Sequence, residues 1–244
     1  MRGDGRARPP ARPGRPARAA WGWPARSLLA SLGDQSRKRL LAIGTLCQFA
    51  PSGRPLMREG DTSTFVLILL DGVVKATGRS QDGKDALLAV RVGGDLVGEL
   101  AAIDGQPRSA TVTTSGTVLA RVVKQADFLD CLRREPEVAA MVNRSVVGKL
   151  RAANARRIDL TGCDVPTRVA RVLHDVVVRY GERTAEGAVL RWPLTQPELA
   201  GLAGAAVVTV NKVLRQLRAD GVVSTGYRSV TVLDLDGAAA VTYP

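Results

Sequence analysis

Cysteine and histidine are scarce in this chain of 244 residues, which has three cysteines and one histidine. Cys47, Cys131 and Cys163 are far apart and form no C-x-x-C pair, so they indicate neither a disulfide framework nor a zinc or iron-sulfur site. We expect them to be buried apolar residues in a reducing cytosol. His174 is expected to be a partly buried helix residue rather than a ligand, and we expect no prosthetic group.

Long apolar runs are also missing. The longest strongly apolar run, residues 65–70, is far too short to cross a bilayer, and the arginine-rich N-terminus lacks the apolar stretch of a secretory signal. We therefore expect a cytoplasmic protein with no membrane partner. A nucleophile paired with a base, a Walker-type loop and a metal-ligand cluster are absent too, so the sequence does not predict an enzyme.

Basic residues are plentiful: 35 Lys and Arg stand against 23 Asp and Glu, a formal charge of +12. Such an excess favours polyanionic partners such as nucleic acid. Half of it belongs to residues 1–26, an Arg-Pro-Ala-Gly segment that cannot bury enough apolar area to fold. We predict a disordered basic tail there; a solvated tail or an over-extended start is favoured over an additional phosphate-binding arm.

The middle of the chain has the sequence pattern of a β domain. After a helical lead-in from Leu28, short β-branched or leucine-rich runs alternate with Gly-Asp turns between residues 46 and 123. This pattern predicts a jelly-roll-like barrel.

Residues 98–110 combine a carboxylate, a guanidinium and a hydroxyl on one predicted strand-turn-strand excursion. Arg108 could place charge-assisted hydrogen bonds on a cyclic phosphodiester, with Ser109 and backbone amides near Gly98 completing the contacts. Glu99, which only accepts hydrogen bonds when ionised, suits a ribose 2′-hydroxyl. In isolation, a surface Glu-Arg pair beside a glycine turn is the more common origin of such a pattern.

A long helix is predicted after Pro136, which suits a helix start, and it ends at the break of residues 161–164. Its apolar face could pack on the barrel or pair with a second copy of the helix, and periodicity alone does not decide between them. The residues assigned to that face are Val138, Met141, Val142, Ser145, Val146, Lys149, Leu150 and Ala153.

The C-terminal third predicts a helix over residues 165–180, a strand over 189–192 and two helices over 196–202 and 206–219. Gly204 allows the tight turn that a helix-turn-helix needs, and a hairpin over residues 222–233 would supply a wing. Charged helix faces are often merely solvated, but the turn and the wing together favour DNA binding.

These motifs resemble the Crp-Fnr family of bacterial transcription regulators. The resemblance is carried by Gly98-Glu99-Leu100 followed by Arg108-Ser109-Ala110, by the segments 164–171 and 194–200, and by glycine-punctuated turns before them. It extends from about Ser27 to about Leu235.

The resemblance implies an α+β protein with an N-terminal β-roll, jelly-roll-like, for cyclic nucleotide binding. The implied division is a cyclic nucleotide-binding domain over residues 27–134, a dimerisation helix over 135–161 and a Crp-type winged helix-turn-helix over 162–236. Residues 237–244 would be a C-terminal tail. The implied function is a cAMP-responsive homodimer that regulates transcription from double-stranded DNA, with RNA polymerase as a further candidate partner. The alternative is a cyclic-nucleotide-gated protein-interaction module with weak or non-specific DNA binding.

The resemblance also names ligand residues, with cAMP as the preferred effector and cGMP or another nucleotide as an alternative. Where the family has Thr or Ser followed by Ser or Asn against the purine, this chain has Ala153-Asn154, so a hydroxyl is missing. The expected ligand residues are Gly98, Glu99, Leu100, Arg108, Ser109 and Asn154.

The recognition helix departs from the family pattern Ser-Arg-Glu-Thr-Val, which is Ala206-Val207-Val208-Thr209-Val210 here. Valine can contact a thymine methyl group but cannot make the bidentate guanine contact of arginine, so the family's usual TGTGA-type half-site is not expected. The expected DNA-binding residues are Thr195, Gln196, Val207, Val208, Thr209, Asn211, Lys212, Arg215 and Arg228.

Overall fold

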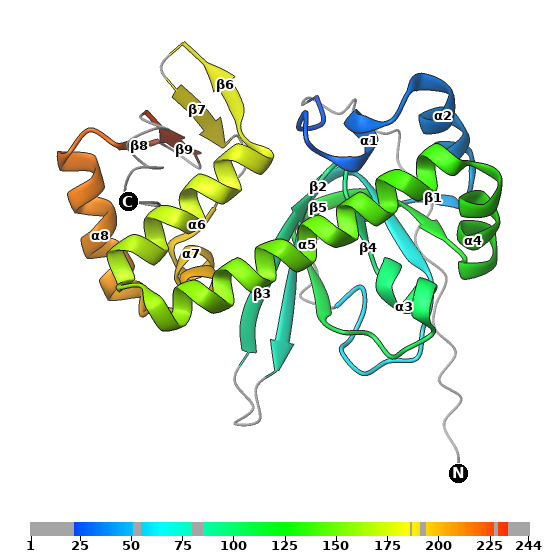
Figure 1. Ribbon diagram of the computed structural model, residues 1–244, viewed down its shortest axis with the longest axis horizontal. Helices are drawn as coiled ribbons and strands as arrows, with labels where there is room; N and C mark the ends of the chain where they lie inside the picture. Colours follow the sequence, from blue (N-terminus) through cyan, green and yellow to red (C-terminus); the bar gives the residue numbers. More distant parts are fainter. Residues whose placement is uncertain are drawn as a thin grey trace.

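A β-sheet body and a helical C-terminal part are joined by one long helix, α5 (Figure 1). The computed structural model describes residues 22–50, 55–79, 85–185, 187–190, 194–226 and 229–233. The tail predicted over residues 1–26 falls mostly outside these ranges, as do residues 237–244 and Arg228.

The body is an antiparallel sheet with the strand order β1-β5-β2-β3, and β4 pairs with β2. Leu67 of β2 lies opposite Val122 of β5 and Val97 of β4, which fixes the register at the centre. The strands are β1 (Thr45–Phe49), β2 (Val66–Arg79), β3 (Asp85–Val92), β4 (Leu96–Val97) and β5 (Thr111–Val123).

Both faces of β2 are buried, since successive side chains of a strand point to opposite faces. Leu67 and Leu69 pack inside the roll with Val118, whereas Val66 and Ile68 pack beneath the flanking helices. These helices are α1 (Leu28–Ser31), α2 (Asp34–Ala42), α4 (Gln125–Arg134) and the start of α5 (Pro136–Gly162). The sheet is therefore covered, as the jelly-roll prediction requires.

The predicted strand-turn-strand excursion contains a short helix instead, α3 (Glu99–Asp104). Gly98 precedes it at φ +86°, where a Cβ atom would lie 2.5 Å from a terminal nitrogen of Arg108. Ala101 and Ala102 are buried, and Ala102 belongs to the apolar core under the flanking helices. Burial of this small-residue pair accounts for a helical turn where the sequence predicted a strand-turn-strand excursion.

The apolar face predicted for α5 divides into two in the structure. Val138 and Val142 are fully buried against the body, whereas Leu150 of the same predicted face is 59% exposed. At about 100° per residue, Leu150 lies roughly 120° from Val138 around the helix axis. Periodicity detected apolar residues but merged two faces into one.

The C-terminal part confirms the predicted helix-turn-helix and wing. Helix α6 (Val165–Tyr180) has the predicted bounds, and Asp164 caps it by accepting from the Thr167 amide at 2.9 Å. Its four-stranded sheet has the order β6-β7-β9-β8. The remaining elements are β6 (Glu182–Thr184), β7 (Gly187–Leu190), α7 (Gln196–Ala203), α8 (Val207–Ala219), β8 (Val223–Gly226) and β9 (Ser229–Val232).

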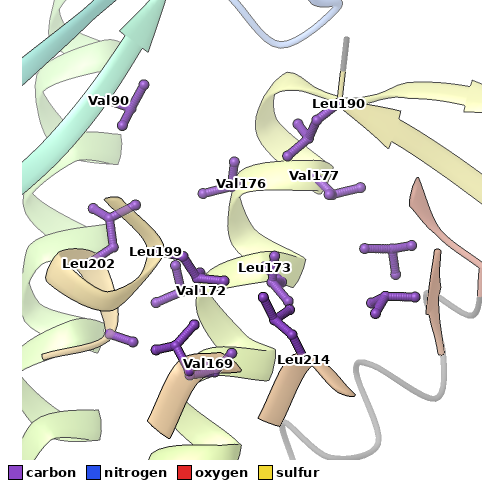
Figure 2. Packing of buried hydrophobic residues seen from close by; sticks show 14 of the residues in the cluster. Val90, Val169, Val172, Leu173, Val176, Val177, Leu190, Leu199, Leu202 and Leu214 are labelled. Atoms are coloured by element: carbon purple, nitrogen blue, oxygen red, sulfur yellow. The ribbon is translucent and has the colours of Figure 1, made fainter. Parts of the chain in front are cut away.

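Figure 2 shows the apolar core of this part, in which Val169 and Leu173 of α6 face Leu199 of α7 and Leu214 of α8. Val210 and Val213 of α8 are also buried. The same core continues into the body, because β-roll residues such as Val90 belong to it. The helix-turn-helix is thus held against the β-roll.

The cysteine prediction is correct only for Cys131, which is buried; Cys47 and Cys163 are partly exposed. Cys163 lies in the link between α5 and α6, and its sulfur accepts from Nη1 of Arg171 at 3.0 Å. A polar interhelical link, rather than an apolar core, surrounds that thiol. His174 is partly buried in α6, as expected. Among the described helices, none is long and apolar enough to span a bilayer.

Candidate nucleotide cassette and DNA-binding helices

Arg108 is the best-anchored residue of the cassette, with only 4% of its surface exposed. Its Nε donates to Ser63 Oγ at 3.1 Å, Nη1 to the Gly98 carbonyl at 2.9 Å and Nη2 to the Phe65 carbonyl at 2.6 Å. The guanidinium also lies 4.8 Å from the centre of the Phe65 ring. Burial lowers the pKa of Arg108, against the nearby Asp61 and Glu99 carboxylates.

An arginine has five N–H donors, so these three contacts leave two for an anion, one on each terminal nitrogen. A rigidly held guanidinium with two donors left suits a compact anion such as a cyclic phosphate.

Glu99 is also buried, at 3% exposure, and it is paired with Lys149 of α5. Its Oε1 lies 2.8 Å from Nζ of Lys149, which also donates to the Leu96 carbonyl at 2.9 Å. Burial lowers the pKa of Lys149, whereas Glu99 opposes that change. Lys149 was assigned to the apolar face of α5; a lysine among buried apolar positions was the available signal for this pair.

The other expected ligand residues are placed differently. Ser109 is exposed beside Arg108, and Leu100 is 41% exposed on α3. Asn154 is exposed on α5, five residues after Lys149 and therefore about 140° around the helix from it. The structure brings Gly98, Glu99 and Arg108 together and leaves Asn154 on another face.

The helix-turn-helix is defined by strong local signals. Thr195 Oγ1 accepts from the Glu198 amide at 3.4 Å, and Glu198 Oε2 accepts from the Thr195 amide at 2.7 Å, which forms a capping box at the start of α7. Gly204 ends that helix at φ +59°. The Thr195 hydroxyl thus has a capping role, and Gln196 beside it is exposed.

The outward side of α8 carries Val207, Val208, Lys212 and Arg215, all of which are exposed, while Thr209 and Asn211 are partly buried. Val208 is 80% exposed, an unusual value for valine in a folded domain. A hollow of about 380 Å³ is lined by Gln196, Val208, Asn211, Arg215 and Arg218. Arg228 lies outside the described residues.

Comparison with known proteins assigns both halves of the chain. Residues 47–135 match the cyclic nucleotide-binding domain family, and residues 167–239 match the Crp-like helix-turn-helix domain family. A CRP-like cAMP-activated global transcriptional regulator of Mycobacterium tuberculosis is 34% identical over 186 residues, which cover 75% of this chain and 82% of that protein. The chain belongs to the Crp-Fnr family of transcription regulators.

Further Crp-Fnr relatives agree. The cyclic AMP receptor protein of Thermus thermophilus is 30% identical over 183 residues, covering 75% of this chain and 81% of that protein. The structure of FixK2 from Bradyrhizobium japonicum superposes with a TM-score of 0.71 at 19% identity, over 83% of this chain and 98% of that chain. This likeness confirms the predicted α+β architecture of β-roll, long helix and winged helix-turn-helix. The chain is a DNA-binding transcription regulator with a cyclic nucleotide-binding domain.

Proposed function

We propose that this protein is a cAMP-activated, dimeric regulator in which nucleotide binding to the β-roll changes the position of the winged-helix domains on DNA. The observation that carries the proposal is the arrangement of Arg108 and Glu99. An anchored guanidinium with two remaining donors is bonded to the Gly98 carbonyl, and the next residue carries the buried carboxylate. A cyclic phosphate and a ribose hydroxyl need these two groups at short range.

cAMP is the effector that we favour. Two relatives carry names that point to cAMP: one, at 34% identity, is a cAMP-activated regulator, and the other, at 30% identity, is a cyclic AMP receptor protein. Ser109 is exposed at the anion site and can donate its hydroxyl to the phosphate, while Gly98 and Leu100 supply backbone at its edge. Asn154 can read a purine edge with its amide, but the missing hydroxyl at Ala153 leaves cGMP or another nucleotide as an alternative.

Dimerisation is proposed to use the exposed apolar stripe of α5. Val147, Leu150 and Ile158 are 48%, 59% and 67% exposed, and at about 100° per residue they lie within roughly a quarter of the helix circumference. Asn154 lies on the same stripe. A two-fold pairing of α5 with its copy would cover these side chains and bring Asn154 to the dimer axis.

DNA is the partner proposed for α8 and the start of α7. Lys212 and Arg215 are exposed cations suited to phosphates or guanine edges, and Gln196 and Asn211 line the hollow beside them. We propose that Thr195, Thr209 and Arg228 contact the sugar-phosphate backbone of the DNA. We propose the domain division given above, with residues 27–134, 135–161 and 162–236 as the three functional parts, and RNA polymerase as a further candidate partner.

A DNA shift assay with and without cAMP, at two salt concentrations, tests the proposal. We expect tighter binding with cAMP and a steep loss of affinity with salt, with Arg108→Leu losing the response to cAMP. The exposed Val207 and Val208 favour one alternative, an interaction module that binds another protein. Binding that is weak at both salt concentrations and indifferent to cAMP would favour that alternative.

A further inference from the structure

Tyr180, the last residue of α6, packs its side chain against the β-roll, in the same apolar cluster as Val90. Only 6% of the residue is exposed. Its hydroxyl donates to Oδ2 of Asp95 at 3.0 Å and lies 3.2 Å from the Val90 carbonyl, and Arg91 Nη1 donates to the hydroxyl oxygen at 3.4 Å. A phenol has one proton, and the Asp95 carboxylate is the stronger acceptor for it.

The acceptor of this bond is held rigidly. Asp95 is 8% exposed and follows the Gly93-Gly94 turn, whose Gly94 carbonyl accepts from the Leu29 amide at 2.9 Å. Burial raises the pKa of Tyr180, so the phenol keeps its proton and remains a donor. The buried Tyr180 hydroxyl and Asp95 carboxylate are therefore satisfied together when α6 is docked, and separating the domains would break the bond between them.

A second contact lies on α7, the first helix of the helix-turn-helix. Lys75 Nζ of β2 is 2.5 Å from Oε1 of Glu198, which is 5% exposed. Gly201 of α7 packs so closely on Leu87 of β3 that a Cβ atom would lie 2.9 Å from the leucine Cβ. The C-terminal part is thus attached to the β-roll at two separate polar points, Tyr180 on α6 and Glu198 on α7, and by apolar packing of α7.

The same segment leads directly to the nucleotide cassette. Asp95 is followed by Leu96, whose carbonyl accepts from Lys149, and Lys149 is paired with Glu99 three residues further on. The acceptor of Tyr180 and the proposed ribose contact, Asp95 and Glu99, are therefore four positions apart in the sequence. A hydroxyl that donates to Glu99 competes with Lys149 for that carboxylate, and any shift of Lys149 acts on the backbone beside Asp95.

We propose that Tyr180 is a positioning residue whose bond to Asp95, the Tyr180–Asp95 latch, sets the place of the helix-turn-helix on the β-roll and couples it to the nucleotide cassette. The coupling role of the latch rests on the proposed function, because it requires that the cassette binds a nucleotide. The positioning role does not depend on any ligand.

Hydrogen exchange read by mass spectrometry tests the positioning role on the full chain. Tyr180→Phe removes one hydroxyl and keeps the ring, and we expect amides of α7 and of residues 93–97 to exchange at least about tenfold faster. Amides of β1 and β5 are the internal reference, because general destabilisation would accelerate them equally. Asp175→Asn is the matched control, since it removes an ion pair with Arg179 on the same helix.

Asp95→Asn keeps an acceptor oxygen and should show an intermediate effect, which separates the latch from loss of packing. DNA affinity with and without cAMP then tests coupling: in Tyr180→Phe the cAMP-dependent ratio should fall at least about fivefold relative to wild type. Unchanged exchange in α7, or acceleration equal to that of β1 and β5, would overturn the latch. If α7 exchanges faster in Tyr180→Phe but the DNA affinity of the wild type does not change with cAMP, the positioning role of the latch is supported and the proposed function is rejected.

Discussion

The ammonium of Lys149 lies 2.8 Å from Oε1 of Glu99, and both side chains are withdrawn from water, at 18% and 4% exposure. Breaking one partner of such a buried pair leaves an uncompensated charge and is costly. The carboxylate that we assign to the ribose is thus already tied to the long helix. Any ligand that uses Glu99 acts on α5 as well.

Glu99→Gln should weaken cAMP binding about tenfold or more, whereas 2′-deoxy-cAMP should lose much less, because the proposed partner is the ribose hydroxyl. Calorimetry with the two nucleotides measures both losses. Lys149→Met is the companion variant, because it removes the other charge and keeps Glu99. Equal losses for the two nucleotides would assign Glu99 a structural role only.

Arg108→Leu should weaken nucleotide binding by at least about 1.5 to 3 kcal/mol, the range for hydrogen bonds to charged groups. Calorimetry on the folded variant measures it, and thermal unfolding checks the fold, because Arg108 also donates to the carbonyls of Phe65 and Gly98. Arg108→Lys is the control: it keeps the positive charge but loses the two parallel donors of the guanidinium, so it should recover only part of the affinity. Wild-type affinity in the folded Leu variant would rule out this anchor.

Leu150→Glu should shift the protein from dimer to monomer in sedimentation, because it would bury like charges across a two-fold interface. Leu150 suits this test because it is 59% exposed in the chain alone. Ala126→Glu adds the same charge to an exposed position on α4 and should leave the dimer intact. If both variants sediment as wild type does, the interface lies on another surface.

Local signals predicted much of this fold. The bounds of α6 follow from Asp164 and Gly181, and the helix-turn-helix follows from Gly204 and the capping residues of α7. Contacts between distant segments could not be predicted from the sequence: Lys149 and Glu99 are 50 positions apart, and Tyr180 and Asp95 are 85 positions apart. Periodicity places residues around a helix but does not say which neighbour each face meets, and so the two faces of α5 were merged.

Lys212 is exposed on α8 and is proposed to neutralise a phosphate. Lys212→Gln should weaken binding to all DNA sequences by similar factors and reduce the slope of log affinity against log salt by about 1. Titrations at several salt concentrations give that slope for the wild type and the variant. A loss confined to one base position would instead make Lys212 a base-reading residue.

Val207 and Val208 occupy the exposed start of the recognition helix, where the family pattern carries arginine and glutamate. Specificity on DNA must then come from Asn211, Lys212, thymine methyl contacts and DNA shape, because valine has no hydrogen-bonding group for a base edge. We predict a site that differs from the TGTGA-type half-site, and a gain of guanine preference in the Val207→Arg, Val208→Glu double variant. Selection from random DNA, with and without cAMP, decides between the outcomes. Recovery of the usual half-site by the wild type would show that these valines do not set specificity, and recovery of no motif in either condition would favour the interaction module over the DNA regulator.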